Sequence, residues 1–141
     1  MTEVKFYQEV NDELLNFAVI VSKHNGKWVF CKHKERSTYE CPGGHCEACE
    51  NIVETAKREL FEETGAVNFY LKQICVYSVV KDNKETFGML YYADIKAFDR
   101  LPEFEIEKVE LFDELPSNWT YPLIQPKLFQ KTNEVIFEKQ T

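Results

Sequence analysis

The segment from Asn51 to Thr64 constrains the fold most, because its apolar residues recur at the spacing of one face of an α-helix. These apolar residues are Ile52, Val53, Ala56 and Leu60. Gly65 follows directly and is a typical stop signal for a helix. A helix with one apolar face has to bury that face against another element, so this segment predicts a layered fold.

The regions on both sides of this helix are rich in β-branched and aromatic residues and predict strands. The predicted strands cover residues 16–22, 27–32, 67–80, 85–95 and 106–112, and turn signals at 24–26 and 82–84 join the first four into two hairpins. Residues 33–38 are expected to form a loop, and residues 41–44 (CPGG) are expected to interrupt regular structure. A second helix is predicted over 122–138, with Pro126 near its first turn. This order predicts an α/β (α+β) fold with helices on the faces of a mixed sheet.

Chain length and composition limit the possible functions. The 141 residues contain no internal repeat and no linker-like tract, so we expect a single domain over residues 1–141. A hydrophobic content of 44% excludes a disordered tail, and a net charge of −7 argues against DNA or an anionic membrane as a partner. No apolar stretch reaches the roughly 20 residues that span a bilayer, and the N-terminus has no features of a secretory signal. With five cysteines, an odd number, we expect a cytoplasmic protein with reduced thiols.

Three carboxylates lie close together on the predicted helix. At about 100° per residue, Glu59, Glu62 and Glu63 fall within about 100° of arc, beside the apolar face. Like charges at this spacing repel one another, and Mg²⁺ or Mn²⁺, which prefer oxygen ligands, would remove that repulsion. From the helix alone, a solvated acidic face is the alternative interpretation.

The residues around the helix favour a metal site over a solvated face. Gly43 and Gly44 precede the helix and provide a flexible backbone that can present a carbonyl to a metal or an amide to a phosphate. Arg58 is placed to pair with Glu50 or Glu62 and to hold their carboxylates in orientation. The full spacing is Gly44-x5-Glu50-x7-Arg58-Glu59-Leu60-x-Glu62-Glu63-x-Gly65-Ala66, and it resembles the Nudix box at every fixed position.

The resemblance to the Nudix family implies a fold and an activity. Residues 39–44 and 111–116 also resemble segments of that family, so the similarity covers most of residues 16–116. Members of the family have an α/β/α sandwich around a mixed sheet. They use Mg²⁺ or Mn²⁺ and a water molecule to hydrolyse a nucleoside diphosphate that is linked to another group.

The same resemblance implies roles for individual residues. The implied metal ligands are Glu59, Glu62, Glu63 and the carbonyl of Gly43, and one of the three carboxylates could also be the general base. Glu50 and Arg58 are implied to orient these ligands. Family members often use a further acid shortly before the last strand, for which Glu103, Glu105 and Glu107 are candidates. Spacing to the strand favours Glu105 as a metal ligand, although an exposed strand edge also favours charged residues.

Candidate substrate-binding residues precede the box. Lys32, His33 and Arg36 lie where an early strand meets the active-site loop, together with Gly43 and Gly44. The three basic residues are candidates for phosphate contacts, and a solvated basic loop is the alternative. No base-binding residue can be identified, because Trp28 and Tyr39 are of a type that is more often found in a core.

The chain is most similar to the short MutT-like members, especially the Bacillus-type 8-oxo-dGTP diphosphatases, in residues 33–44, 88–95 and 112–116. This similarity implies a nucleoside triphosphate substrate, such as an oxidised purine nucleotide. Alternatives are a nucleotide sugar, a dinucleotide, an RNA 5′ end, or a sensor that binds nucleotide without hydrolysis. The ADP-ribose subclass carries a Pro after the box, and no Pro occurs here between Pro42 and Pro102. The resemblance leaves a monomer or a homodimer open.

A cluster of cysteines suggests a different metal. Cys41, Cys46 and Cys49, with His33 and His45 nearby, could bind Zn²⁺. No second Cys-x2-Cys pair follows, so three ordinary thiols are the simpler interpretation. Cys49 also replaces a Gly that the box commonly has, and Cys41 replaces a common aromatic residue. We expect both to alter the shape of the loop rather than metal binding.

Overall fold

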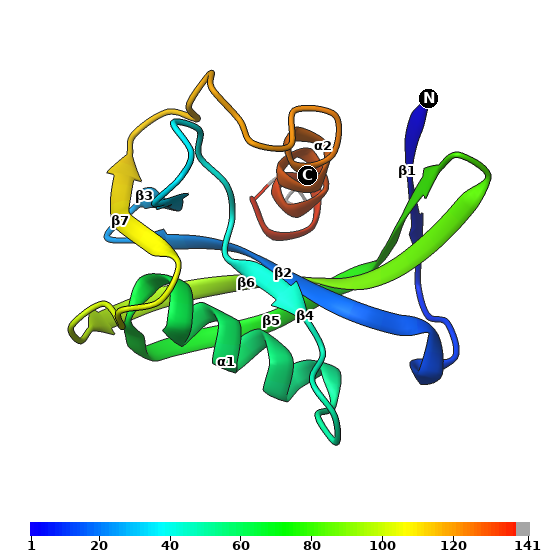
Figure 1. The fold of residues 1–141 in the computed structure, drawn as a ribbon, viewed down its shortest axis with the longest axis horizontal. Coiled ribbons are helices and arrows are strands. Elements are labelled where there is room, and N and C mark those ends of the chain that lie inside the picture. The colour runs from blue at the N-terminus through cyan, green and yellow to red at the C-terminus, as the bar shows by residue number, and fades with distance from the viewer. Residues whose placement is uncertain (138–141) are drawn as a thin grey trace.

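The computed structural model describes residues 1–137, which form a mixed sheet with helices on both of its faces (Figure 1). The strands are β1 (Thr2–Tyr7), β2 (Leu15–His24), β3 (Lys27–His33), β4 (Gly43–His45), β5 (Ala66–Lys81), β6 (Lys84–Phe98) and β7 (Ile106–Phe112). The helical segments are the 3₁₀ turn η1 (Asp12–Leu14), α1 (Ile52–Thr64), α2 (Gln125–Thr132) and the π-helical turn η2 (Asn133–Phe137). The five predicted strands and the two predicted helices are confirmed in this order.

The sheet runs in the order β1-β5-β6-β2-β3-β7, with β4 added beside β2. The central strand β2 pairs in parallel with β6 and antiparallel with β3 and β4, so the sheet is mixed as expected. Both faces of β2 are covered, which explains its nearly continuous run of apolar residues. Alternate side chains enter two separate cores, with Ile20 in the core beneath α1 and Val21 in the core beneath α2.

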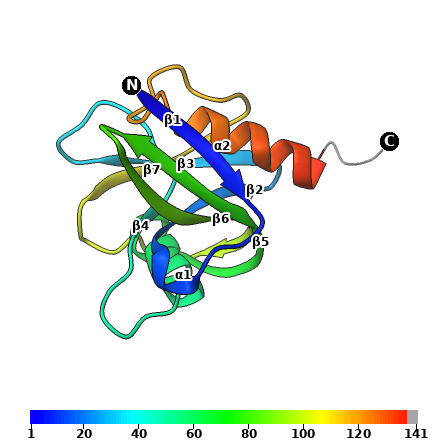
Figure 2. The same cartoon turned by 90° about the vertical axis from the view of Figure 1, so that its right-hand side faces the viewer.

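α1 and α2 lie on opposite faces of the sheet, as Figures 1 and 2 show from two directions. Ala56 and Leu60 of α1 are fully buried against one face. Leu128 and Phe129 of α2 are buried against the other face, where the ring of Phe129 stacks on Phe30 at 5.3 Å between centroids. This arrangement confirms the α/β/α sandwich. Within residues 1–137, no helix is both long enough and apolar enough to span a membrane.

Local signals fix both ends of α1. Asn51 and Glu54 form a reciprocal capping box, in which each side chain accepts a hydrogen bond from the backbone N–H of the other residue, both at 2.9 Å. Gly65 ends the helix at φ 80°, in the left-handed region that favours glycine. A Cβ atom at this position would lie 2.7 Å from the carbonyl oxygen of Asp99. The predicted bounds of this helix are therefore confirmed to within one residue.

The expectation that residues 41–44 lack regular structure was wrong for the two glycines. Gly43–His45 forms the short strand β4, which pairs antiparallel with residues 17–19 of β2. The pairing depends on a side chain of minimal size, because a Cβ atom on Gly43 would lie 2.5 Å from the carbonyl oxygen of Ala18. Glycine is a weak strand former, so the local sequence gave no signal for this strand.

Three further features differ from the sequence prediction. β1 was not predicted, and it pairs with the second half of β5. The first hairpin pairs only at its turn, between residues 23–24 and 27–28, because β4 occupies the same side of β2 farther along. The closing helix begins at Gln125 rather than at residue 122, with Pro126 in its first turn as predicted. The last residue of the predicted helix, Glu138, lies outside the described residues.

Candidate active site

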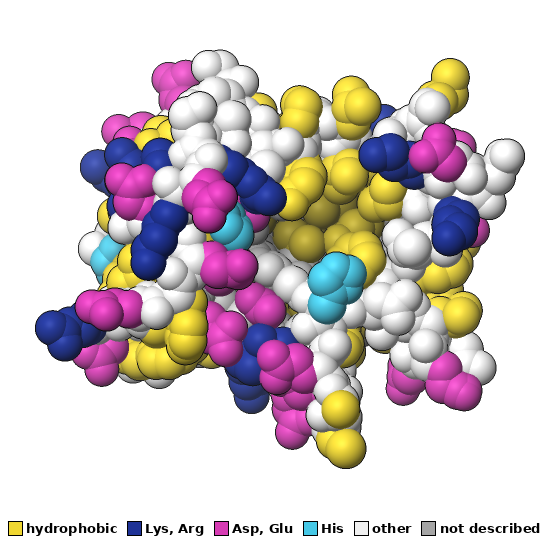
Figure 3. Space-filling model, viewed as in Figure 1, with side chains coloured by type: hydrophobic (Ala, Val, Ile, Leu, Met, Phe, Trp, Pro, Cys, Tyr) yellow, Lys and Arg dark blue, Asp and Glu magenta, His cyan; other side chains and the backbone are white. Residues whose placement is uncertain are grey.

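A cavity of about 640 Å³ opens between α1, β4 and the segment that leads into α2. Its polar part is lined by His33, Arg36, Glu40, Gly43, Gly44, His45, Glu47, Glu59, Glu63 and Glu105. Its apolar part is lined by residues that include Phe17, Val19, Tyr77, Val79, Ile124 and Leu128. Figure 3 shows this cavity as a hollow with an apolar floor, beside which acidic side chains gather over β4 and α1.

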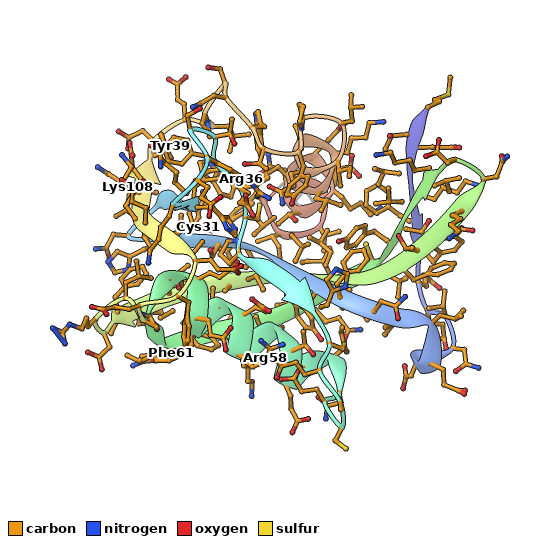
Figure 4. All side chains as sticks on the ribbon, in the orientation of Figure 1. Cys31, Arg36, Tyr39, Arg58, Phe61 and Lys108 are labelled. Atoms are coloured by element: carbon orange, nitrogen blue, oxygen red, sulfur yellow. The ribbon has the colours of Figure 1, made fainter. Side chains whose placement is uncertain are left out.

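Arg58 is the centre of a carboxylate network on α1. Its Nε and Nη2 atoms donate to the two carboxylate oxygens of Glu50, with Nη2 at 3.1 Å from Oε1. Its Nη1 atom lies 3.1 Å from Oε2 of Glu59 and 3.3 Å from Oε1 of Glu62. Nη2 also donates to the carbonyl oxygen of His45 at 3.0 Å, which ties α1 to β4. Figure 4 shows Arg58 beside α1, below β4 in this view, whereas Arg36 lies above β4.

Glu50 is fully occupied by hydrogen bonds within this network. Besides Arg58, the hydroxyl of Thr55 donates to Oε1 at 2.7 Å, and the backbone N–H of Glu47 donates to the same oxygen at 3.0 Å. The hydrogen bonds from Arg58 lower the pKa of Glu50 to about 2. These hydrogen bonds hold the carboxylate of Glu50 in one orientation beside Arg58.

Glu63 is the most deeply buried carboxylate of the three on the helix face, at 8% exposed. The backbone N–H of Gly43 donates to its Oε1 atom at 2.9 Å. Burial raises the pKa of Glu63 to about 8, opposed by this hydrogen bond and reinforced by the charges of Glu59, Glu40 and Glu105. The helix therefore places a carboxyl group where its ionised form is disfavoured unless a positive charge is added.

The backbone of Gly43 faces this carboxyl group because of the register of β4. Hydrogen bonds between β2 and β4 join Ile20 N to Pro42 O at 2.9 Å and Cys46 N to Asn16 O at 2.8 Å. Hydrogen-bonded and non-hydrogen-bonded pairs alternate in an antiparallel ladder, so Gly43, opposite Val19, is in a non-hydrogen-bonded pair. Its N–H and C=O groups therefore both point away from β2, which leaves the carbonyl available at the cavity.

Glu59 lies directly against the backbone of Gly44. A Cβ atom on Gly44 would lie 2.2 Å from Oε2 of Glu59, so only glycine allows this approach. Burial raises the pKa of Glu59, opposed by the charge of Arg58 and reinforced by that of Glu62. Glu62 itself is turned toward Arg58 and does not line the cavity. The structure thus brings Glu59 and Glu63 into the cavity and leaves Glu62 at its margin.

Of the three predicted basic residues, His33 and Arg36 line the cavity, and both contact the buried carboxylate of Glu40. Glu40 accepts from Arg36 Nη1 at 2.8 Å, and its other oxygen lies 3.2 Å from His33 Nε2. Lys32 does not line the cavity, because its ammonium group donates to Glu107 and to the carbonyl of His33. Glu40 was not predicted as a site residue. Its buried position follows from pairing with Cys31, which the local sequence does not indicate.

The three candidate acids around the start of β7 have different surroundings. Glu105 lines the cavity, and its charge raises the pKa of both Glu59 and Glu63. Glu107 pairs with Lys32, which lowers its pKa, and neither Glu107 nor Glu103 lines the cavity. Glu105 is therefore the candidate that the fold brings to the other carboxylates.

Trp28 and Tyr39 are partly buried, pack against the core beneath α2 and do not line the cavity. The ring of Trp28 packs on Phe129 at 5.0 Å between centroids, and the ring of Tyr39 packs on Phe112 at 5.1 Å. The apolar part of the cavity was not predicted from the sequence. It is assembled from β2, β5 and α2, so no short motif marks it.

The three clustered cysteines have different surroundings. Cys41 is buried, Cys46 is partly exposed, and Cys49 is exposed with a φ of 67°. This φ explains why a glycine is common at the position of Cys49. Within residues 1–137, no group of three or more His, Cys, Asp or Glu side chains is arranged to hold a metal ion. The zinc interpretation of the cysteine cluster therefore gains no support. The three helix carboxylates accept hydrogen bonds from Arg58 and from the backbone N–H of Gly43.

Known proteins of similar sequence and fold indicate the family of this chain. The NUDIX domain model matches residues 13–130. YtkD of Bacillus subtilis (strain 168), which carries the provisional name 8-oxo-dGTP diphosphatase, is 38% identical over 100 residues, and the match spans 70% of this chain and 63% of that relative's length. The crystal structure of a mutant of the B. subtilis pyrophosphohydrolase BsRppH superposes with a TM-score of 0.81 and 28% identity, over 96% of this chain and 92% of that chain. The NUDIX domain of Shewanella oneidensis NrtR, solved with ADP ribose, shares the fold at a TM-score of 0.65 and 16% identity, over 85% and 86% of the two chains. This chain belongs to the Nudix hydrolase family.

Proposed function

We propose that this chain hydrolyses a pyrophosphate bond of a nucleoside triphosphate in a reaction that requires Mg²⁺ or Mn²⁺. The observation that carries the proposal is the meeting of Glu59, Glu63, Glu105 and the Gly43 backbone at one end of a cavity whose other end is apolar. A nucleotide has the same division into a charged polyphosphate and a flat, largely apolar base. The size of the cavity is within the range of ligand pockets, roughly 300–1,000 Å³.

A divalent cation suits this set of donors. Carboxylate and carbonyl oxygens are the ligands that Mg²⁺ and Mn²⁺ prefer. Burial, together with neighbouring carboxylates, raises the pKa of both Glu59 and Glu63, so a bound cation would favour their ionised forms. Glu59, Glu63 and the Gly43 carbonyl would hold the cation, and Glu62 would join after a rotamer change away from Arg58. When bound, the cation neutralises the pyrophosphate and lowers the pKa of a bound water.

The remaining polar residues have separate tasks in this proposal. Arg58 and Glu50 keep the carboxylates of α1 oriented through their mutual hydrogen bonds. Glu105 supplies a further ligand or accepts the proton of the attacking water. His33 and Arg36, on the other wall, contact the phosphate oxygens, for which a guanidinium fork is well suited.

The name of one relative supports an oxidised purine nucleotide as the substrate. The provisional name of YtkD is 8-oxo-dGTP diphosphatase, and BsRppH is a pyrophosphohydrolase. Both are consistent with attack on a polyphosphate chain, so we place 8-oxo-dGTP first. Another nucleoside diphosphate derivative, such as a nucleotide sugar, a dinucleotide or an RNA 5′ end, is the second candidate. A sensor without turnover predicts a degraded box, whereas Arg58 and all three helix carboxylates are present here.

A substrate panel tests the proposal. The chain is assayed with 8-oxo-dGTP, the ordinary nucleoside triphosphates, ADP-ribose and a 5′-triphosphorylated RNA, each with Mg²⁺ or Mn²⁺. Release of pyrophosphate and of phosphate is followed separately, because their ratio shows which bond is broken. Metal-dependent turnover of a triphosphate supports the proposal. Nucleotide binding without turnover of any compound would favour the sensor.

A further inference from the structure

Glu40 is a buried carboxylate in the wall of the cavity, at 6% exposed. Its Oε1 atom accepts a hydrogen bond from Arg36 Nη1 at 2.8 Å, and its Oε2 atom lies 3.2 Å from His33 Nε2. Each carboxylate oxygen therefore faces one of the two basic side chains that we assign to the phosphates. A carboxylate at this depth requires such partners, because an unpaired buried charge is costly.

The backbone around Glu40 is fixed from two sides. On one side, Glu40 and Cys31 exchange two backbone hydrogen bonds, both of 3.0 Å. On the other side, the backbone of Tyr39 donates to Asn118 O and accepts from Thr120 N, both at 2.9 Å. The carboxylate is therefore attached to a frame that is built from segments far apart in the sequence.

The two basic residues belong to a part of the chain with less support of its own. Arg36 lies in residues 34–38, which form neither helix nor strand, and its side chain is 42% exposed. An arginine side chain has many rotamers, so an exposed one samples several of them unless a partner selects one. His33 is the last residue of β3, where the pairing with β7 shifts its register. Glu40 is the buried partner that these two residues share.

We propose that Glu40 is a positioning residue for phosphate binding, which holds Arg36 and His33 in one arrangement with further donors available to the cavity. This proposal rests on the proposed function, because it places the polyphosphate between these side chains and the carboxylates of α1. A guanidinium has five N–H donors, so its bond to Glu40 leaves others for phosphate oxygens. His33 Nε2 faces an oxygen and therefore carries a proton, and Nδ1 can donate to a phosphate when the ring is protonated.

Two other roles for Glu40 predict different results. A metal ligand needs a free oxygen, whereas both oxygens of Glu40 already have partners. A charge that acts only at a distance would repel phosphate, so its removal would tighten binding. The charge of Glu40 does reach across the cavity, since it is one of the causes that raise the pKa of Glu63. Weaker phosphate binding after the charge is removed is therefore the result that distinguishes positioning from repulsion.

Two variants of Glu40 separate its charge from its reach. Glu40→Gln removes the charge at the same length, and Glu40→Asp keeps the charge on a shorter side chain. Both should weaken the binding of inorganic pyrophosphate with saturating Mg²⁺, measured by calorimetry, by at least about fivefold, because charge-assisted hydrogen bonds are lost. Glu110→Gln is the matched control, since Glu110 holds Tyr39 and Lys108 but does not line the cavity. This control should leave pyrophosphate binding unchanged.

The kinetic effect and a combined variant test whether Glu40 acts through the two basic residues. For any nucleotide that is hydrolysed, the loss in both variants should appear in KM, with kcat within about threefold of the wild type. In a protein that already carries His33→Gln and Arg36→Gln, adding Glu40→Gln should not weaken pyrophosphate binding further, whereas a general packing role would repeat the loss. Tighter binding in Glu40→Gln, a loss confined to kcat, or at least about tenfold weaker binding of Mg²⁺ alone would overturn the proposal.

A measurement on the wild type does not depend on the folding of any variant. The guanidinium protons of Arg36 are followed by NMR before and during titration with pyrophosphate and Mg²⁺. They should exchange with water more slowly than those of Arg100, whose guanidinium makes no hydrogen bond within residues 1–137, and they should shift on titration. Equal exchange in the free protein, or pyrophosphate binding without a shift, would refute the positioning role. If no nucleotide is hydrolysed but pyrophosphate binding depends on Glu40 in this way, the proposed hydrolysis fails while the positioning role stands.

Discussion

Glu63 should destabilise the metal-free protein, so its replacement by Gln should make that protein more stable. The carboxyl group has a pKa of about 8 in the folded chain, against 4.5 for an ordinary glutamate. Between these two values, the folded state binds more protons than the unfolded state does. Stability therefore falls as the pH rises from about 4.5 to about 8 and stays at the lower level above it.

The magnitude follows from the difference between these pKa values. One pKa unit corresponds to about 1.4 kcal/mol, so holding this carboxyl protonated up to pH 7 costs up to about 3 kcal/mol. The group borders an open cavity, and water reduces this cost to about 1–3 kcal/mol. The Glu63→Gln substitution keeps a side-chain oxygen that can accept from Gly43 and removes the group that ionises. Because about 1 kcal/mol shifts the Tm of a chain of this size by about 3–4 °C, the variant should melt about 3–10 °C higher at pH 7 in a chelator.

The assay is thermal unfolding of the wild type and of Glu63→Gln in EDTA from pH 5 to pH 8, repeated with excess Mg²⁺. The stabilising effect of the substitution should grow with pH, and Mg²⁺ should raise the Tm of the wild type more than that of the variant. Glu103→Gln is the matched control, because Glu103 is exposed and lies outside the cavity. A variant less stable than the wild type in EDTA at pH 8, or a difference that does not change with pH, would refute the reasoning.

Three further predictions concern single residues. Gly44→Ala should displace the Glu59 carboxylate, since the new Cβ atom would lie 2.2 Å from its Oε2 atom, and kcat should fall at least about tenfold while the far-UV circular dichroism spectrum stays the same. Cys49→Gly should raise the free energy of unfolding by up to about 1 kcal/mol in urea titrations, because glycine tolerates the φ of 67°; a clear loss of stability would contradict this. Among Glu103→Gln, Glu105→Gln and Glu107→Gln, only Glu105→Gln should lower kcat by about a hundredfold, and a deficit confined to another position would refute its assignment.

The sequence was sufficient for elements whose signals are local. The capping residue Asn51, the periodic apolar face and the terminal Gly65 lie within α1 or directly beside it, so its bounds were predictable. The long hairpin of β5 and β6 has a short turn between two β-branched runs, and it was predictable for the same reason. The box residues could be named because their spacing along one helix is itself the signal.

Features that depend on distant pairing were not predictable. β4 consists of two glycines and one histidine, and its strand conformation comes from the backbone of β2. Glu40 becomes a site residue only because it pairs with Cys31 and holds Arg36 and His33. Gln125 lines the cavity, and its side-chain oxygen accepts a hydrogen bond from the backbone N–H of Cys41. Nothing near Gln125 in the sequence indicates that partner. In each case the determinant is a contact between segments that are separate in the chain.

The most direct test of the account is the rate of metal-dependent pyrophosphate or phosphate release from a nucleoside triphosphate by Glu63→Gln. The account predicts that this variant, although more stable than the wild type without metal, is slower by at least about a hundredfold with saturating Mg²⁺ or Mn²⁺. Such a result would separate the catalytic role of the carboxylate from any role in folding. A rate close to that of the wild type would contradict the claim that the cavity beside Glu63 is the active site.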